Sequence, residues 1–226
     1  MPEFKTTNAL VLSAHRISEH TFILSLLTQE NGRWRGAINA KIPPESGSFV
    51  HARWQARLSE QTGRFYIEQT DSFWTRFMFD KKRLSALMSL CYLSDKLLPE
   101  RQPCPDFYNK TTDFLTHLEQ DDFLARYVQL EVNLLHATGF GLDTSSCAGG
   151  GDRNNLAYIS PKSGRAVSLE KGKPYHDKLL PLPAFLWHKA PVTPSDIRMG
   201  LNLTGYFLTH HAGLDALPAV RDILCD

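Results

Sequence analysis

The strongest constraint on this chain is a change in the spacing of its apolar residues, which passes from every second position to a helical repeat near residues 75–80. Before that point, short apolar runs are separated by turn-forming residues such as the pair Asn31-Gly32. Strands are predicted at residues 8–16, 21–30, 33–41, 49–58 and 64–71. Five short consecutive strands favour a small closed barrel.

After that point, apolar residues recur at the i, i+3, i+4 spacing of amphipathic helices. Helices are predicted over residues 80–100, 105–120, 121–141 and 196–211, with a hairpin over 156–169 and a short C-terminal helix over 217–226. The predicted fold class is therefore α+β. It combines a five-stranded barrel domain at residues 1–78 with a mainly α-helical domain at residues 79–226.

Composition places the chain among ordinary globular proteins, because 42% of its 226 residues are hydrophobic and 22% are charged. No apolar run approaches the ~20 residues that cross a bilayer, and the N-terminus lacks the pattern of a secretory signal. We therefore expect a cytoplasmic protein. The net charge of +1 means that a local basic surface would have to hold any polyanionic partner.

The segment SSCAGGGDRNN, residues 145–155, begins like one half of a zinc knuckle. A second thiolate would stand three positions after Cys147, but Gly150 occupies that position. The other cysteines are distant in sequence, and the histidines show no ligand spacing. We therefore expect reduced thiols, no bound metal and no cofactor.

Phosphate-binding and catalytic motifs are also missing from the sequence. The glycines at 149–151 are not followed by the Lys-Ser/Thr pair of a P-loop, which predicts a flexible surface loop. Neither a G-x-S-x-G nor an H-E-x-x-H motif occurs. We therefore expect that the protein is not an enzyme, and we assign no catalytic residue.

The clearest chemical signal is a set of basic residues on one face of the predicted barrel. Period-2 alternation places Trp54 on one side of its strand and Arg53 on the other, while Tyr66 shares a face with Arg64. Cations that neutralise phosphates, beside an aromatic ring, are what a nucleic-acid groove requires. The DNA-binding candidates are Arg33, Arg35, Lys41, Arg53, Arg57 and Arg64. The alternative is an ordinary solvated sheet face.

Four stretches carry a family resemblance: ALVLSAHRISEHTFILSLLTQENGRWRGAI, ARWQARLSEQTGRF, LEVNLLHATGFGLDTSSCAGGG and LAYISPKSGRAVS. Through them the chain resembles the RecO family of bacterial recombination mediators along nearly its whole length. The resemblance implies an N-terminal OB-fold and a helical domain with a zinc-ribbon-like insertion. Some members bind zinc there through four cysteines, whereas Cys147 stands alone here. The resemblance thus implies a retained scaffold that lacks the zinc ligands.

The same resemblance implies partners. RecO-like proteins bind single- and double-stranded DNA, anneal complementary strands, and associate with RecR and with the acidic C-terminal tail of single-stranded DNA-binding protein, so helping RecA to load. A nucleoid-associated location in the cytoplasm follows. The family's tail-binding arginine positions before Glu131 are occupied here by Val128 and Gln129. Arg126 is the nearest substitute, and the tail-binding candidates are therefore Arg126, Tyr127 and Leu130.

One departure from the family lies in the loop after the third strand, which is often densely basic in RecO proteins. Here the loop reads NAKIPPESGS, and Lys41 is its only cation. Part of any DNA affinity is therefore expected from Lys81, Lys82 and Arg83.

Two hypotheses follow. The first is a non-enzymatic recombination mediator whose barrel grips DNA and whose helical domain docks protein partners. In that case the loss of Arg53 and Arg57 lowers the salt dependence of DNA binding by about 1 to 2 units on a log–log plot. The alternative is a protein-interaction adaptor whose barrel binds a protein partner with little direct DNA contact. An adaptor would show no saturable binding of an oligonucleotide.

Overall fold

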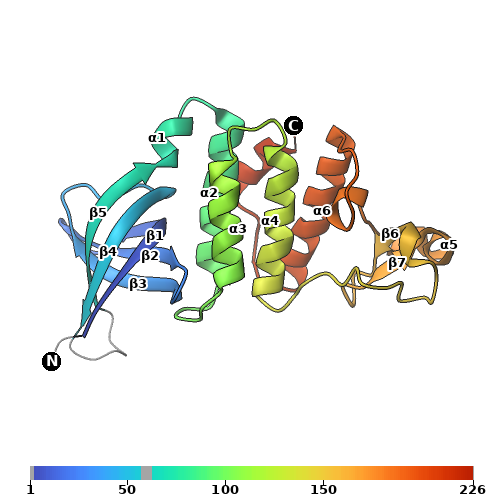
Figure 1. The fold of residues 1–226 in the computed structure, drawn as a ribbon, viewed down its shortest axis with the longest axis horizontal. Coiled ribbons are helices and arrows are strands. Elements are labelled where there is room, and N and C mark those ends of the chain that lie inside the picture. Colours follow the sequence, from blue (N-terminus) through green and yellow to red (C-terminus); the bar gives the residue numbers. More distant parts are fainter. Residues whose placement is uncertain (1–2, 57–62, 226) are drawn as a thin grey trace. The chain divides into compact units, whose positions relative to one another are not determined.

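The computed structural model describes residues 3–56 and 63–225, and it begins with a closed five-stranded barrel (Figure 1). The strands are β1 (Glu3–Arg16), β2 (Thr21–Thr28), β3 (Gly32–Asn39), β4 (Ser48–Ala56) and β5 (Arg64–Ser72). Their order around the barrel is β1-β2-β3-β5-β4, and β3–β5 is the parallel pair that closes it. The barrel predicted from the apolar alternation is confirmed.

Strand β1 starts five residues earlier than the sequence predicts, at Glu3 instead of residue 8. Its first half pairs with β4, from Glu3 opposite Ala56 to Leu10 opposite Phe49. Its second half pairs with β2. The polar start of β1 is therefore held by backbone pairing with β4, which apolar periodicity does not reveal.

The barrel interior is filled by aromatic rings from three strands. The Trp34 and Trp54 ring centroids lie 5.0 Å apart, and Phe65 meets Trp34 edge-on at 5.7 Å. Gly36 leaves room for them, because a Cβ at that position would lie 2.6 Å from the Phe65 ring. Trp34, Trp54 and Phe65 are at most 3% exposed, so the outward positions of the same strands are the ones available to partners.

Two compact units can be distinguished by backbone contacts: residues 1–119 with 218–224, and residues 120–217 with 225–226. The first unit contains the barrel together with α1 (Phe73–Phe77), α2 (Lys81–Leu97), α3 (Pro105–Thr116) and the 3₁₀ helix η4 (Ala219–Leu224). The change of period near residue 78 therefore does not coincide with the division into units. The domain boundary that we place there stays a prediction.

Helix α2 packs on the barrel through specific contacts with β1. The Ser13 hydroxyl donates to the Asp95 carboxylate at 2.9 Å, and the buried Cys91 thiol donates to the Val11 carbonyl at 3.7 Å. Burial raises the pKa of Cys91 to about 12, so this thiol stays protonated. The C-terminal segment, predicted as a short α-helix, instead forms η4 and lies against α2.

The second unit is organised around α4 (Phe123–Ala137) and α6 (Pro194–His210). The helices approach closely, because a Cβ at Gly200 would lie 2.7 Å from Val128. Between them the Thr204 hydroxyl donates to Glu131 at 2.5 Å, and both residues are buried. Thr193 caps α6 by accepting from the backbone of Asp196, whose carboxylate accepts the Thr193 N–H in return.

The rest of the second unit is a small sheet with flanking turns. It contains η1 (Arg153–Asn155), β6 (Leu156–Ile159), β7 (Ala166–Ser168), α5 (Leu169–Gly172), η2 (Lys173–Lys178), β8 (Leu180–Pro181) and η3 (Ala184–Leu186). The strand order is β7-β6-β8. The hairpin predicted at 156–169 is confirmed, and its turn uses Gly164 at φ +67.

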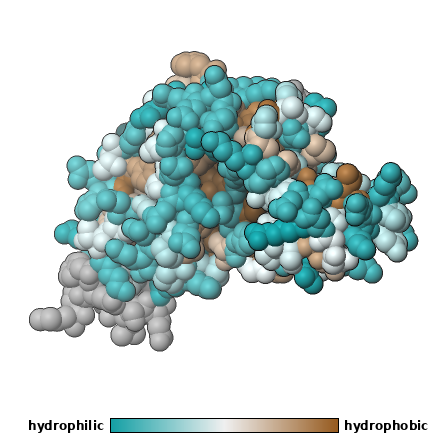
Figure 2. All heavy atoms as spheres, turned by 45° about the vertical axis from the view of Figure 1, so that its right-hand side comes forward, coloured by the Kyte–Doolittle hydropathy of each residue, from teal (hydrophilic) through white to brown (hydrophobic). Residues whose placement is uncertain are grey.

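Exposed large apolar side chains are distributed along the chain, from Ile17 to Val192. Phe79 is 94% exposed and Ile42 80%. On the face drawn in Figure 2, hydrophilic residues predominate and the hydrophobic areas are separate from one another. No helix in the described ranges is both long and apolar enough to span a membrane.

Candidate nucleic-acid interface

The outer face of β4 and β5 carries two exposed cations of the predicted set, Arg53 and Arg64. Alternation along β4 turns Trp54 inward and Arg53 outward, and along β5 it turns Phe65 inward and Arg64 outward. The register places Arg53 opposite Tyr66, and Arg64 stands two pairs further along the same ladder, on the same face. Arg53 and Arg64 are therefore diagonal neighbours, roughly 7–8 Å apart at the backbone.

Tyr66 joins these two arginines into one surface. Its ring is 45% exposed, and the Arg53 guanidinium carbon lies 5.1 Å from the ring centroid. Stacking of this kind orients a guanidinium while leaving its N–H groups available. Among residues 3–56 and 63–225, neither Arg53 nor Arg64 has an ion-pair partner. We call Arg53, Arg64 and Tyr66 the Arg–Tyr surface.

Arg33 and Arg35 also point outward, from β3, but carboxylates of the first unit compensate their charges. Arg33 donates to the Leu98 carbonyl at 2.7 Å and lies 3.6 Å from Asp95, with only 16% of its side chain exposed. Arg35 pairs with Glu100 at 2.6 Å. These two arginines thus bind the segment after α2 to the barrel, and they do not join the Arg–Tyr surface.

The remaining predicted cations are dispersed. Lys41 is exposed in the loop between β3 and β4, whereas Arg57 lies outside the described residues. Lys81 and Lys82 are exposed in the first turn of α2. Arg83, in contrast, pairs with Asp80 at 2.7 Å and donates to carbonyls at the end of the α3 segment, so its guanidinium is engaged within the unit.

Two cations that sequence reasoning missed lie at the tryptophan end of the barrel. The Lys5 ammonium is 5.9 Å from the Trp34 ring centroid, and the Arg101 guanidinium is 5.8 Å from that of Trp54. Lys5 could have been found by extending the alternation of β1 towards its start. Arg101 could not have been found from residue spacing, because it reaches the ring from the irregular segment after α2. The backbone φ angle of Arg101 is 60°.

The three predicted tail-binding residues are not brought together at the surface. Tyr127 is 0% exposed and Leu130 2%, so both belong to the core of the second unit. Arg126 is bound within its own helix end, where it pairs with Asp122 at 3.0 Å and donates to Gln120 at 3.2 Å. The reason is the helical period of α4, which turns positions 127 and 130 inward. The expected cation beside an exposed apolar pocket is therefore not formed by this set.

The zinc-knuckle segment holds its sulfur by hydrogen bonds. The Ser168 N–H donates to Cys147 Sγ at 3.1 Å, and the Ser168 hydroxyl lies 3.5 Å from that sulfur. Burial acts to raise the pKa of Cys147, but the hydrogen bonds from Ser168 and from the Gly149 and Gly151 amides outweigh it and lower the pKa to about 7. Across the described ranges, no three His, Cys, Asp or Glu side chains gather as a metal would require. These residues do not fit a structural zinc ion.

Comparison with known proteins agrees with this architecture. A family model described as Recombination protein O C terminal matches residues 78–220. DNA repair protein RecO of Rhodospirillum centenum is 41% identical over 214 residues, which cover 91% of this chain and 86% of that protein. The RecO proteins of Methylocella silvestris and Bartonella quintana are each 39% identical, over 88% and 90% of this chain and 84% and 87% of their own lengths.

Proposed function

The chain belongs to the RecO family of DNA repair and recombination proteins, and from this premise we propose that it binds single- and double-stranded DNA through the Arg–Tyr surface. The observation that carries the proposal is the pair of exposed guanidinium groups of Arg53 and Arg64, which have no ion-pair partner among the described residues, beside the half-exposed Tyr66 ring. Guanidinium groups bind phosphates in a bidentate manner, and an aromatic face accepts a base or a sugar.

The proposed activity is non-enzymatic mediation of recombination, including the annealing of complementary strands. The sequence has no phosphate-binding loop for a nucleoside triphosphate, which supports annealing driven by base pairing alone. Contacts to phosphates carry no sequence information, so two different strands would be held equally well. A strand held at its backbone keeps its bases available for pairing.

The proposed partners are RecR, the C-terminal tail of single-stranded DNA-binding protein and, indirectly, RecA. The support for them is membership of the family. The burial of Tyr127 and Leu130 leaves Arg126 as the only accessible member of the tail-binding set, so docking of the tail at this site would need an apolar pocket from other residues.

A direct binding measurement tests the DNA proposal. Fluorescence anisotropy with labelled oligothymidylate, and with a labelled duplex, is recorded at low salt for the full chain. We expect saturable binding that weakens at least tenfold in the double variant Arg53→Gln, Arg64→Gln, because two phosphate contacts are removed. The matched control is Lys162→Gln, Lys171→Gln, which removes the same charge from exposed positions of the second unit. Equal losses in both double variants would refute the assignment to the barrel.

The adaptor function has its own supporting observation, which is the compensation of Arg33 and Arg35 by carboxylates of the same unit. This compensation reduces the cationic area of the barrel. The same titration separates the two functions, since an adaptor with little DNA contact gives no saturable anisotropy change with either oligonucleotide.

A further inference from the structure

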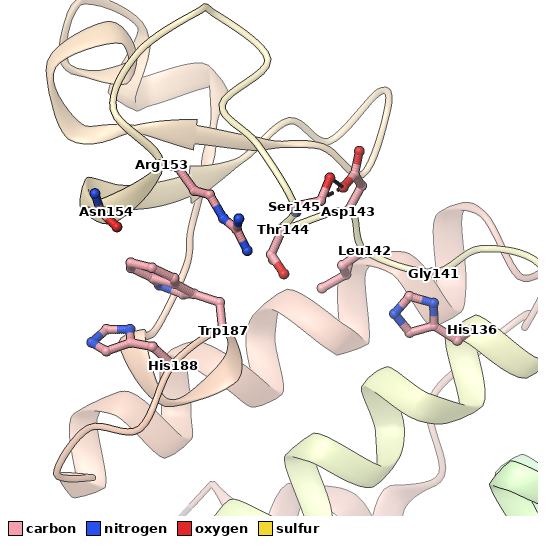
Figure 3. Close-up of a pocket in the computed structure, with 10 residues that line it drawn as sticks. All are labelled: His136, Gly141, Leu142, Asp143, Thr144, Ser145, Arg153, Asn154, Trp187 and His188. Carbon is pink, nitrogen blue, oxygen red and sulfur yellow. Dashed lines mark hydrogen bonds between the residues drawn. The ribbon is translucent and has the colours of Figure 1, made fainter.

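A cavity of about 660 Å³ lies within the second unit (Figure 3). Its volume falls in the range of ligand sites, about 300–1,000 Å³. The lining comes from the end of α4, the loop after it, η1 and the turn after η3. The lining residues used below are Leu142, Asp143, Thr144, Arg153, Trp187 and His188.

Arg153 supplies an available positive charge. Its side chain is exposed and has no hydrogen-bond or ion-pair partner among the described residues. Figure 3 shows its guanidinium extending into the hollow between Trp187 and Thr144. An anion entering the cavity would therefore meet a guanidinium whose N–H groups are not already in use.

The carboxylate that lines the cavity does not cancel this charge. Asp143 accepts from the Ser145 hydroxyl at 2.6 Å and lies 3.5 Å from Arg165. Hydrogen bonds from Ser145, with a smaller contribution from Arg165, lower the pKa of Asp143. Its negative charge is thus already compensated by Ser145 and Arg165. The surrounding segment is basic, with seven Lys and Arg against four Asp and Glu between residues 140 and 190.

Trp187 supplies a flat aromatic surface to the cavity. Its ring lies against the His188 imidazole, with centroids 4.1 Å apart and planes inclined by 53°. Its Nε1 atom is buried and has no hydrogen-bond partner in the described parts of the chain. Because Nε1 is itself inaccessible, the face of the indole ring, and not this N–H group, is the part of Trp187 that a ligand in the cavity would meet.

The charge of Arg153, the ring of Trp187 and the polarity of the remaining lining together indicate the class of ligand. Leu142 and Trp187 are the apolar members of the lining, and the other side chains are polar or charged. A peptide that anchors through several apolar side chains would find little to bury there. A nucleotide is polar, carries a phosphate and presents a flat base. We propose that this cavity binds one nucleotide of single-stranded DNA, with the base on Trp187 and a neighbouring phosphate on Arg153. The proposal rests on the proposed function of DNA binding and adds a second contact point to it.

The first experiment compares Arg153→Gln with Lys162→Gln in the full chain, by anisotropy with labelled oligothymidylate and with a labelled duplex. Arg153 has no hydrogen-bond or ion-pair partner to lose in the part of the chain that the structure describes, so thermal unfolding of both variants should match that of the unmodified chain. We expect Arg153→Gln to weaken single-strand binding several-fold and to lower the log–log salt slope by about 0.7, with a smaller effect on the duplex, whose bases are stacked. Equal effects of the two substitutions would overturn the proposal.

The second experiment locates the base by photo-crosslinking to an oligonucleotide that contains 5-iododeoxyuridine, followed by tryptic digestion and mass spectrometry. A base in the cavity marks the peptide of residues 179–189, which contains Trp187, whereas a base on the barrel marks residues 65–76, which contain Tyr66. We expect the first adduct, and we expect it to decrease in Arg153→Gln.

The adducts also separate this proposal from the barrel assignment. An adduct on 179–189 alone supports the cavity and contradicts the barrel. An adduct on 65–76 alone supports the barrel and contradicts the cavity. Binding of a labelled Asp- and Phe-rich peptide that depends on Arg153, without the 179–189 adduct, would assign the cavity to a protein partner and overturn its assignment to DNA.

Discussion

Arg35 and Arg64 offer a strict test of whether carboxylate compensation decides which cations bind DNA. Both extend from the outer face of the same barrel, and both can be replaced by Gln with the same loss of formal charge. They differ in one respect: Arg35 lies 2.6 Å from Glu100, while Arg64 has no ion-pair partner among residues 3–56 and 63–225. If only a cation without an ion-pair partner binds phosphate, Arg64 contributes to DNA binding and Arg35 does not.

The expected magnitude follows from counterion release. Each phosphate neutralised contributes about 0.7 to the slope of log Kd against log salt for a single strand, and about 0.9 for a duplex. Arg64→Gln should therefore lower the single-strand slope by about 0.7, and the double variant with Arg53→Gln by about 1.4. Arg35→Gln should leave the slope nearly unchanged, because the charge that it removes is already balanced.

The reciprocal substitution, Glu100→Gln, releases Arg35 from its ion pair. The Arg35 side chain is 51% exposed, so the pair is partly solvated and its loss should cost less than about 1 kcal/mol of stability. If Arg35 then lies along the path of the DNA, the slope rises by up to about 0.7. A rise confirms that compensation alone keeps Arg35 out of the interface.

Anisotropy titrations with labelled oligothymidylate, at salt concentrations from about 50 to about 200 mM, supply these slopes. Thermal unfolding of each variant verifies that it is folded. The reasoning is refuted if Arg35→Gln lowers the slope as much as Arg64→Gln does, or if the double variant of Arg53 and Arg64 keeps the full slope.

Three further predictions concern the scaffold that carries these surfaces. Gly32→Ala should destabilise the first unit strongly, measured by urea unfolding, because φ is +62 and an added Cβ would lie 1.8 Å from the Gln102 carbonyl oxygen; an unchanged midpoint would contradict that geometry. Thr204→Val should cost about 1–3 kcal/mol in the same assay, since it removes a hydroxyl donor from the buried Glu131, and a neutral result would mean that the bond contributes nothing. For Cys147, the lowered pKa of about 7 against an ordinary value of 9 means that the thiolate stabilises the fold at pH 9 and that this contribution is lost as pH falls through 7. The destabilisation caused by Cys147→Ala should therefore grow between pH 6.5 and 9 on a series of unfolding curves, and a pH-independent difference would contradict the thiolate assignment.

Much of the barrel could be predicted because strand alternation is a local property. The neighbours Arg53 and Trp54 must face opposite sides of one strand, whatever lies elsewhere in the chain. The helical period of α4 is equally local, and it places Tyr127 and Leu130 on the inward face of the helix. For those two residues, the signal was present in the sequence.

The partners of Arg33 and Arg35, and the cavity of the second unit, could not be predicted from the spacing of neighbouring residues. The partners of Arg33 and Arg35 are 62 to 65 residues further along the chain, at Asp95, Leu98 and Glu100, and only the packing of α2 on β1 brings them to β3. The cavity beside Arg153 is similar, since its walls come from four segments of the second unit. No pattern within a single segment could have indicated it.

The sequence by itself determined the five-stranded barrel, the helices that follow it, and the side of each strand on which an arginine stands, because these depend on the spacing of neighbouring residues. The tertiary structure alone decided which of those arginines are paired with a carboxylate. The physical reason is that a guanidinium is neutralised by whichever carboxylate is folded against it, and the distance along the chain does not predict that neighbour.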